Sequence, residues 1–168
     1  MPEKTNASRI LEKQKINFEL IEYAVDEEHL DAVHVADSIQ QDIATVYKTL
    51  ILQGDKTGYF VCVIRGDKEV DLKKAAKISG NKKVAMIPMK DLFPLTGYIR
   101  GGCTAIGMKK NFPVYIDERA LELDKFHVSA GRRGLQIRLS PSDYIRVTHA
   151  TSGDLIKDSE EEPTVETN

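Results

Sequence analysis

The spacing of apolar and polar residues along the chain predicts short helices mixed with short strands. Near the N-terminus, Ala7, Ile10 and Leu11 recur at helical spacing and follow Thr5, a residue type that caps helices. This first helix is expected to run to about Lys15. The same kind of pattern, with capping residues, glycines and prolines at the ends, predicts further helices over residues 31–40, 71–78, 88–93 and from 140 onward.

Two long apolar runs predict a β-hairpin near the centre of a sheet. They cover residues 46–53 and 59–64, and a turn-forming segment with a glycine at each end separates them. Lys48 lies near the start of the first run, where an exposed lysine that extends its stem along the surface is the ordinary interpretation. Shorter runs predict further strands over residues 18–23, 84–86, 113–117, 126–129 and 135–139. Because helices and strands do not alternate regularly, the pattern indicates a single mixed α+β domain.

Charge is distributed unevenly along the chain. The 168 residues are 41% hydrophobic and 30% charged, which suits one globular domain, and the formal net charge is −2. Residues 151–168 contain six acidic residues and one lysine, a net charge of −5, which leaves +3 for residues 1–150. We therefore expect a domain over residues 1–150 and a disordered acidic tail over residues 151–168. A mildly basic domain is compatible with an RNA partner.

Cysteine usage and hydropathy bear on location and cofactors. Cys62 and Cys103 are the only cysteines, and no apolar run approaches the roughly 18 residues of a membrane span. We therefore expect a cytoplasmic protein without a disulfide and without a membrane partner. No Cys/His spacing is typical of a zinc site, so we expect neither a metal ion nor another cofactor.

A glycine-rich segment at residues 100–110 is the first candidate for chemistry. It has three glycines within seven residues, and Lys109 and Lys110 follow at once. Glycine tolerates positive φ angles and lets another molecule approach the backbone, so its N–H groups can converge on an oxygen or a phosphate. The spacing fits neither the Walker motif nor the dinucleotide-binding motif. A tight turn between two strands is the alternative.

Four segments, residues 46–50, 71–77, 101–110 and 128–135, together resemble the YbaK/EbsC family of aminoacyl-tRNA deacylases. This family is related to the editing domain of bacterial prolyl-tRNA synthetase, and the resemblance covers about residues 5–150. It implies a mixed, β-barrel-like sheet flanked by helices. The implied activity is the removal of cysteine mischarged onto proline tRNA. The implied partners are that tRNA and, as a candidate, prolyl-tRNA synthetase.

The resemblance also implies the roles of individual residues. Lys48 would anchor the 3′-terminal adenosine or its phosphate and stabilise the developing oxyanion, and the Gly101 and Gly102 N–H groups would complete the cradle. The implied catalytic residues are Lys48 and Gly101. The implied substrate-binding residues are Tyr23, Leu30, Thr49, Gly102, Ser129 and Gln136. The candidate contacts to the tRNA backbone are Lys109, Lys110, Arg132 and Arg133.

The reaction expected from the resemblance needs no base from the enzyme, because the cysteine thiol of the substrate attacks its own carbonyl. The sequence contains no Ser-His-Asp signature, so orientation and oxyanion stabilisation would supply the catalysis.

Alternatives remain open. Cys103 could be a nucleophile with His127 or His149 as its base. The protein could act on alanine or another small residue, since Thr104, Ala105 and Gln136 differ from the family pattern. It could also bind tRNA or a synthetase without catalysis.

Overall fold

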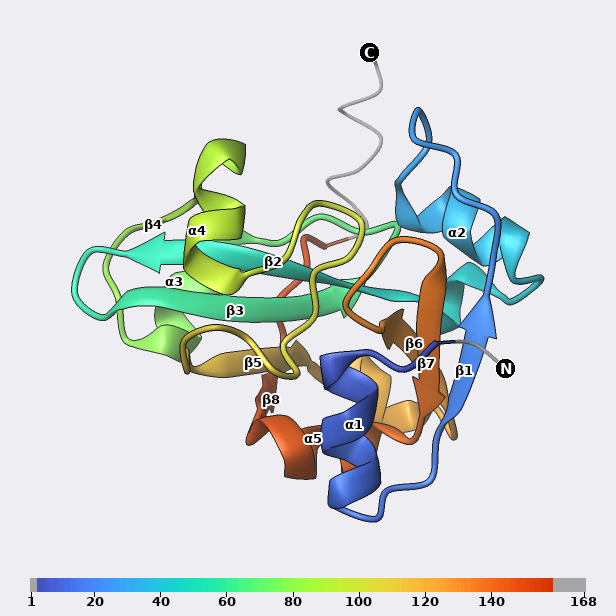
Figure 1. The fold of residues 1–168 in the computed structure, drawn as a ribbon. Helices are drawn as coiled ribbons and strands as arrows, with labels where there is room; N and C mark the ends of the chain where they lie inside the picture. Colours follow the sequence, from blue (N-terminus) through green and yellow to red (C-terminus); the bar gives the residue numbers. More distant parts are fainter. Residues whose placement is uncertain (1–2, 159–168) are drawn as a thin grey trace.

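Eight β-strands form two sheets in the computed structural model, which describes residues 3–158 (Figure 1). The smaller sheet is antiparallel and has the strand order β1 (Glu19–Glu22), β7 (Leu135–Leu139) and β6 (Phe126–Ser129). The larger sheet has the order β4 (Val84–Met86), β2 (Tyr47–Gly54), β3 (Gly58–Arg65), β5 (Val114–Asp117) and β8 (Thr151–Gly153). In the larger sheet β3 pairs with β5, and β5 with β8, in parallel, while the other pairings are antiparallel. The mixed α+β class is confirmed.

The two sheets meet at the residue before β2, where Val46 forms a parallel bridge to His127 of β6. The sheets enclose the main core without closing into a barrel. The predicted hairpin is confirmed as β2 and β3, paired from Tyr47 with Arg65 to Gly54 with Gly58. Its two faces belong to different cores, which explains the continuous apolar sequence of β3: Val61 and Val63 face the core between the sheets, and alternate residues face the core beside α3.

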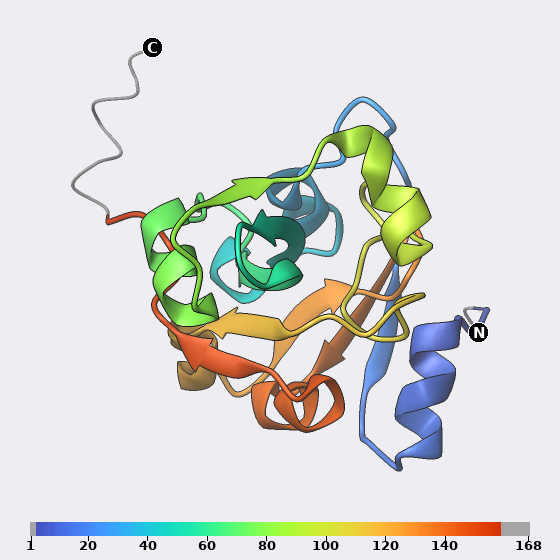
Figure 2. The same cartoon turned by 90° about the vertical axis from the view of Figure 1, so that its left-hand side faces the viewer.

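Five α-helices and three short 3₁₀ helices cover the sheets within residues 3–158. They are α1 (Asn6–Lys13), α2 (Ala32–Ser38), α3 (Leu72–Ser79), α4 (Leu92–Thr96) and α5 (Pro141–Thr148), with η1 (Ile43–Thr45), η2 (Met89–Asp91) and η3 (Glu118–Glu122). The helix expected over residues 88–93 is thus divided between η2 and α4. Helices α2 and α4 lie at one end of the molecule, and α1 and α5 lie at the opposite end (Figures 1 and 2).

Local sequence explains where the helices begin and end. Thr5 and Ser8 form a reciprocal capping box, in which the Ser8 amide donates to the Thr5 hydroxyl oxygen and the Thr5 amide donates to the Ser8 hydroxyl oxygen. The Asp71 carboxylate accepts two backbone N–H groups at the start of α3, from Lys73 and Lys74. Helix α3 ends at Gly80, whose φ angle of 80° is the left-handed conformation that glycine adopts most easily. The predicted capping residues are therefore confirmed here.

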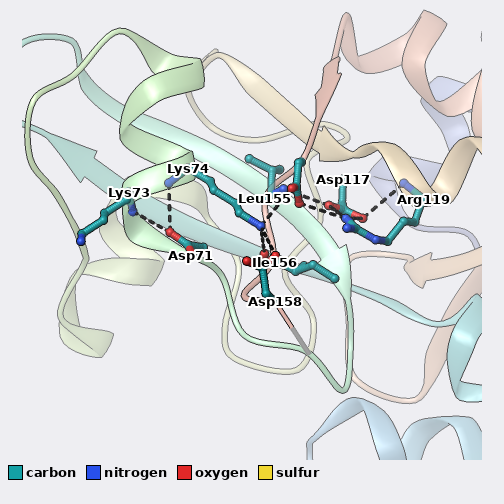
Figure 3. Close-up of polar contacts among 9 residues, drawn as sticks. Asp71, Lys73, Lys74, Asp117, Arg119, Leu155, Ile156 and Asp158 are labelled. Atoms are coloured by element: carbon teal, nitrogen blue, oxygen red, sulfur yellow. Dashed lines mark hydrogen bonds and ion pairs between the residues drawn. The ribbon is translucent and has the colours of Figure 1, made fainter. Parts of the chain in front are cut away.

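The expectation of a disordered tail from residue 151 is wrong for residues 151–158. Thr151–Gly153 forms β8 at the edge of the larger sheet, and the side chains of Leu155 and Ile156 are buried. The Asp117 carboxylate accepts the Leu155 N–H at 2.9 Å, and Lys74 Nζ lies 2.9 Å from the carboxylate of Asp158 (Figure 3). The acidic composition of residues 151–168 gave no indication that two apolar residues of this segment are buried in the core. The remainder of the predicted tail, residues 159–168, lies outside the described residues.

Within residues 3–158, no helix has the length and the apolar character required to cross a membrane.

Candidate active site

A cavity of about 320 Å³ lies where the first half of β2, the start of α2 and the β4–α4 connection meet. This size is typical of a site for a small molecule or one end of a larger ligand. Lys48 and Thr49 contribute from β2, and Leu30 and Asp31 contribute from the residues before α2. Other elements complete the lining with Met86, Ile87, Met89, Leu92, Arg100, Gly101, Cys103, Ser129 and Gln136. Six predicted site residues from separate parts of the chain are therefore brought together: Leu30, Lys48, Thr49, Gly101, Ser129 and Gln136.

Lys48 lies in the cavity wall and is half-buried, so its interpretation as an ordinary exposed lysine is wrong. Within the described structure, the side-chain amine of Lys48 makes no hydrogen bond and no ion pair. Burial lowers the pKa of Lys48, and the nearby carboxylates of Asp67, Glu69 and Asp31 act in the opposite direction. A partly desolvated amine without a protein partner is suited to binding an oxygen atom of a ligand.

The glycine-rich segment contributes to the cavity through Gly101, not through Gly102. Gly101 has a φ angle of 87° and lines the cavity, and its N–H has no acceptor among the described residues. Gly102 is buried and does not line the cavity, and its N–H already donates to the Ile99 carbonyl at 2.9 Å. A Cβ atom on Gly102 would lie 3.0 Å from the Arg132 backbone. The prediction that the Gly102 N–H completes the cradle is therefore wrong, because this glycine serves close backbone packing.

Ser129 and Gln136 form a polar pair at the end of the cavity beside the smaller sheet. They are directly paired across β6 and β7 and are only 9% and 4% exposed. Ser129 Oγ accepts the Gly131 N–H at 3.2 Å, which leaves its own hydroxyl proton for another acceptor. Gln136 Oε1 has no hydrogen-bond partner within the described structure. Because an unsatisfied buried acceptor costs about 1–3 kcal/mol, these two residues are suited to polar contacts with a ligand.

The backbone of β2 is open towards the cavity. Strand β4 pairs only with Leu52–Gly54 of β2, and the Ile87 N–H then donates to the Ile51 carbonyl. Alternate residues of an antiparallel strand direct their backbone groups to the same side, so those of Thr49 point the same way as those of Ile51. Since Thr49 also lines the cavity, its N–H and C=O are available there besides its side chain.

Tyr23 does not line this cavity. It lies in an adjoining depression together with His29 and His34, and the two hollows share Leu30 and Val35. The Tyr23 N–H donates to the Gly134 carbonyl at 2.9 Å.

The four residues expected to contact the tRNA backbone lie outside the cavity lining. Lys109 and Lys110 are exposed, whereas Arg133 braces the glycine-rich segment through an Nε donation to the Arg100 carbonyl at 2.8 Å. Arg132 is half-buried, 3.8 Å from the carboxylate of Glu22. Sequence reasoning did not select Arg100, which lines the cavity and is exposed. Its place directly before Gly101 was the available signal.

Cys103 lines the cavity without a base beside it. Burial raises the pKa of its thiol to about 12, so the thiol is protonated at neutral pH. Neither His127 nor His149 is among the residues that line the cavity. The ring of His127 is buried, with Nδ1 3.1 Å from the Thr45 hydroxyl oxygen. The arrangement therefore does not support Cys103 as an activated nucleophile. Within residues 3–158 there is also no cluster of histidine, cysteine or carboxylate side chains that could hold a metal ion.

Comparisons with known proteins identify the family to which the chain belongs. The family model of the aminoacyl-tRNA editing domain matches residues 26–147. A protein of Enterococcus faecalis, described as a candidate Cys-tRNA(Pro)/Cys-tRNA(Cys) deacylase and named EbsC, is 50% identical over 147 residues, which are 88% of this chain and 90% of the relative.

Two solved structures have the same fold. One, described as a candidate trans-editing enzyme for prolyl-tRNA synthetase, has a TM-score of 0.79 at 22% identity and covers 94% of this chain and 100% of its own. The other, a hypothetical protein, has a TM-score of 0.83 at 20% identity and covers 91% of this chain and 100% of its own. Since the family model spans most of the chain and the curated relative is half identical to it, the chain belongs to the aminoacyl-tRNA editing domain family.

Proposed function

We propose that this protein is a trans-editing deacylase that removes cysteine from mischarged proline tRNA. Membership of the editing family supports an aminoacyl ester as the substrate, and the name of the E. faecalis relative supports cysteine as the acyl group. The observation that carries the proposal is Lys48, an amine without a protein partner in a cavity that also contains the free Gly101 N–H. Prolyl-tRNA synthetase is the partner we propose, because its mischarged product would be the substrate.

The site would act mainly by stabilising charge. The ester carbonyl oxygen, which becomes negative in the transition state, would lie between Lys48 and the Gly101 N–H. One such contact is worth about 100- to 1,000-fold in rate in enzymes that stabilise an oxyanion. Lys48 could alternatively hold an oxygen of the terminal ribose or phosphate, which would position the same ester. Ser129 and Gln136 would contact the amino-acid side chain.

The thiol of the substrate would be the nucleophile. Its sulfur would form a bond to the ester carbon, and the bond from that carbon to the ribose oxygen would break. The thiol proton would end on the ribose hydroxyl, and the cysteine would leave as a cyclic thioester. The cavity supports this scheme because it has no histidine in its lining and the Cys103 thiol is held protonated.

Substrate assistance predicts a large difference between cysteine and serine on the same tRNA. The two amino acids have nearly the same shape, but an alcohol is far less ionised than a thiol near neutral pH. We expect cysteine to be released much faster than serine or alanine when the three mischarged proline tRNAs are incubated with the purified protein. Equal rates for cysteine and alanine would contradict substrate assistance and favour a water nucleophile. Faster release of alanine would instead identify alanine as the substrate, and tight tRNA binding without any turnover would indicate a non-catalytic module.

The exposed cations predict a salt-dependent interaction with the tRNA backbone. Replacing Lys109 and Lys110 together by alanine should weaken tRNA binding and reduce the slope of log affinity against log salt by about one unit per lost phosphate contact. Titrations at several salt concentrations would measure this slope. Lys13→Ala is the matched control, because Lys13 is an exposed lysine at the end of α1. An unchanged slope in the double variant would exclude these lysines from the tRNA interface.

A further inference from the structure

Asp31 is the one carboxylate among the described residues that line the cavity. It occupies the N-cap position of α2, but its side chain makes no capping hydrogen bond to the helix. Instead, one carboxylate oxygen lies 2.5 Å from His34 Nδ1. The carboxylate is therefore not used to stabilise the helix end, although aspartate is a preferred residue there.

The surroundings of Asp31 fix its direction and its charge. The rings of His34 and His29 stack with their centroids 4.3 Å apart, and His29 is held in turn by Asp26 at 2.7 Å. Burial is the largest single effect and acts to raise the pKa of Asp31. The hydrogen bond to His34, the charge of that ring and backbone hydrogen bonds together outweigh burial, so the pKa lies below its ordinary value. Asp31 thus presents an ionised carboxylate at the cavity wall at neutral pH.

An aminoacyl ester brings one feature that the other lining groups do not match. Its free α-amino group carries a positive charge when protonated, whereas the cationic side chains of Lys48 and Arg100 repel a positive charge. Ser129, Gln136 and the backbone of Thr49 are neutral. A hydrogen bond between charged groups is stronger than one between neutral groups, so the ammonium group should select Asp31.

We infer that Asp31 binds the α-ammonium group of the aminoacyl ester and thereby makes the site selective for aminoacyl-tRNA over tRNA whose amino acid is blocked at nitrogen. This inference rests on the proposed function. It fixes the orientation of the substrate, with the ammonium group at Asp31 and the ester oxygen near Lys48 and Gly101. His34 acts as a positioning residue for the carboxylate. The site would accordingly spare N-acylated and peptidyl-tRNA, which lack the cation.

The test compares two substrates and three proteins. Cysteinyl and N-acetylcysteinyl proline tRNA are incubated with the wild type, with Asp31→Asn and with Asp26→Asn, and kcat/KM is measured for each pair. Asp26→Asn is the matched control, because Asp26 holds the neighbouring histidine in the same way but does not line the cavity. Each variant is nearly isosteric with the wild type and replaces an exposed side chain, so the fold should be retained.

We expect Asp31→Asn to lower kcat/KM for cysteinyl-tRNA by about 10- to 100-fold, the range for one hydrogen bond between charged groups. Its kcat/KM for the N-acetyl substrate should stay close to that of the wild type. The ratio of kcat/KM between the free-amine and the N-acetyl substrate should therefore fall. Asp26→Asn should keep the wild-type preference. If Asp31→Asn also keeps that preference, the inference is overturned while the proposed function stands. If the wild type itself releases no cysteine, the proposed function fails, and this inference fails with it.

Discussion

Replacing Lys48 by alanine is expected to reduce deacylation by at least about 100-fold, the scale of one lost oxyanion contact. Lys48 lies in the cavity wall with no protein partner among the described residues, so its amine is available to the ester. The rate of release of labelled cysteine from proline tRNA measures the effect. Near-wild-type turnover by the variant would remove Lys48 from the catalytic site.

The same substitution should leave the fold intact. Burial lowers the pKa of Lys48, so its environment disfavours the charged form in the folded state. Below this lowered pKa, the charged Lys48 therefore reduces the free energy of unfolding. The reduction disappears as the pH rises to the pKa of a lysine in the unfolded chain. The melting temperature of Lys48→Ala at neutral pH should therefore not fall, and Lys13→Ala should change neither activity nor melting temperature. A large loss of stability in Lys48→Ala would mean that the lysine supports the fold.

Replacing Leu155 by alanine is expected to lower the free energy of unfolding by about 2–5 kcal/mol, the range for deleting a buried leucine side chain. Leu155 is 0% exposed and lies in the core beside α3 with Leu52 and Phe60. Its N–H donates to the buried Asp117 carboxylate, which fixes the segment in place (Figure 3). Denaturant titration with both proteins measures the difference.

Leu121→Ala is the matched control for this prediction, because it removes the same atoms from a leucine that is 48% exposed. Its effect should stay within about 0.5 kcal/mol, as for most surface substitutions. Truncation after Gly153 should destabilise the protein at least as much as Leu155→Ala, since it also removes Ile156 and the partners of Lys74. Unchanged stability of the truncated protein would show that the segment contributes nothing to the folded state.

The sequence predicted the elements well where local chemistry decides them. The capping box at Thr5, the glycine at the end of α3 and the apolar runs of β2 and β3 depend on residues close together in the chain. The segment after residue 150 was predicted wrongly because a composition average cannot show that Leu155 and Ile156 pack on a distant strand and helix. Local sequence patterns do not show which distant segments of the chain pack together.

The site was predicted in part, for a related reason. Lys48, Gly101 and Gln136 were identified from a family resemblance, and they do line one cavity. Asp31 and Arg100 were missed although each is next to a predicted site residue, Leu30 or Gly101, because adjacency in sequence does not show which side chains face the cavity. Gly102 was assigned the wrong role, since a glycine needed for backbone packing looks the same in sequence as one that opens towards a ligand.

One measurement tests the central claim most directly: the rate at which the purified protein releases the amino acid from cysteinyl and from prolyl proline tRNA at neutral pH. The cavity, the free Lys48 amine and the need for a thiol predict that cysteine is released far above the spontaneous rate. Proline, which has no thiol, should be released at close to the spontaneous rate. Cysteine release no faster than spontaneous hydrolysis, or equal acceleration for both amino acids, would contradict the proposal that this protein edits cysteine from proline tRNA.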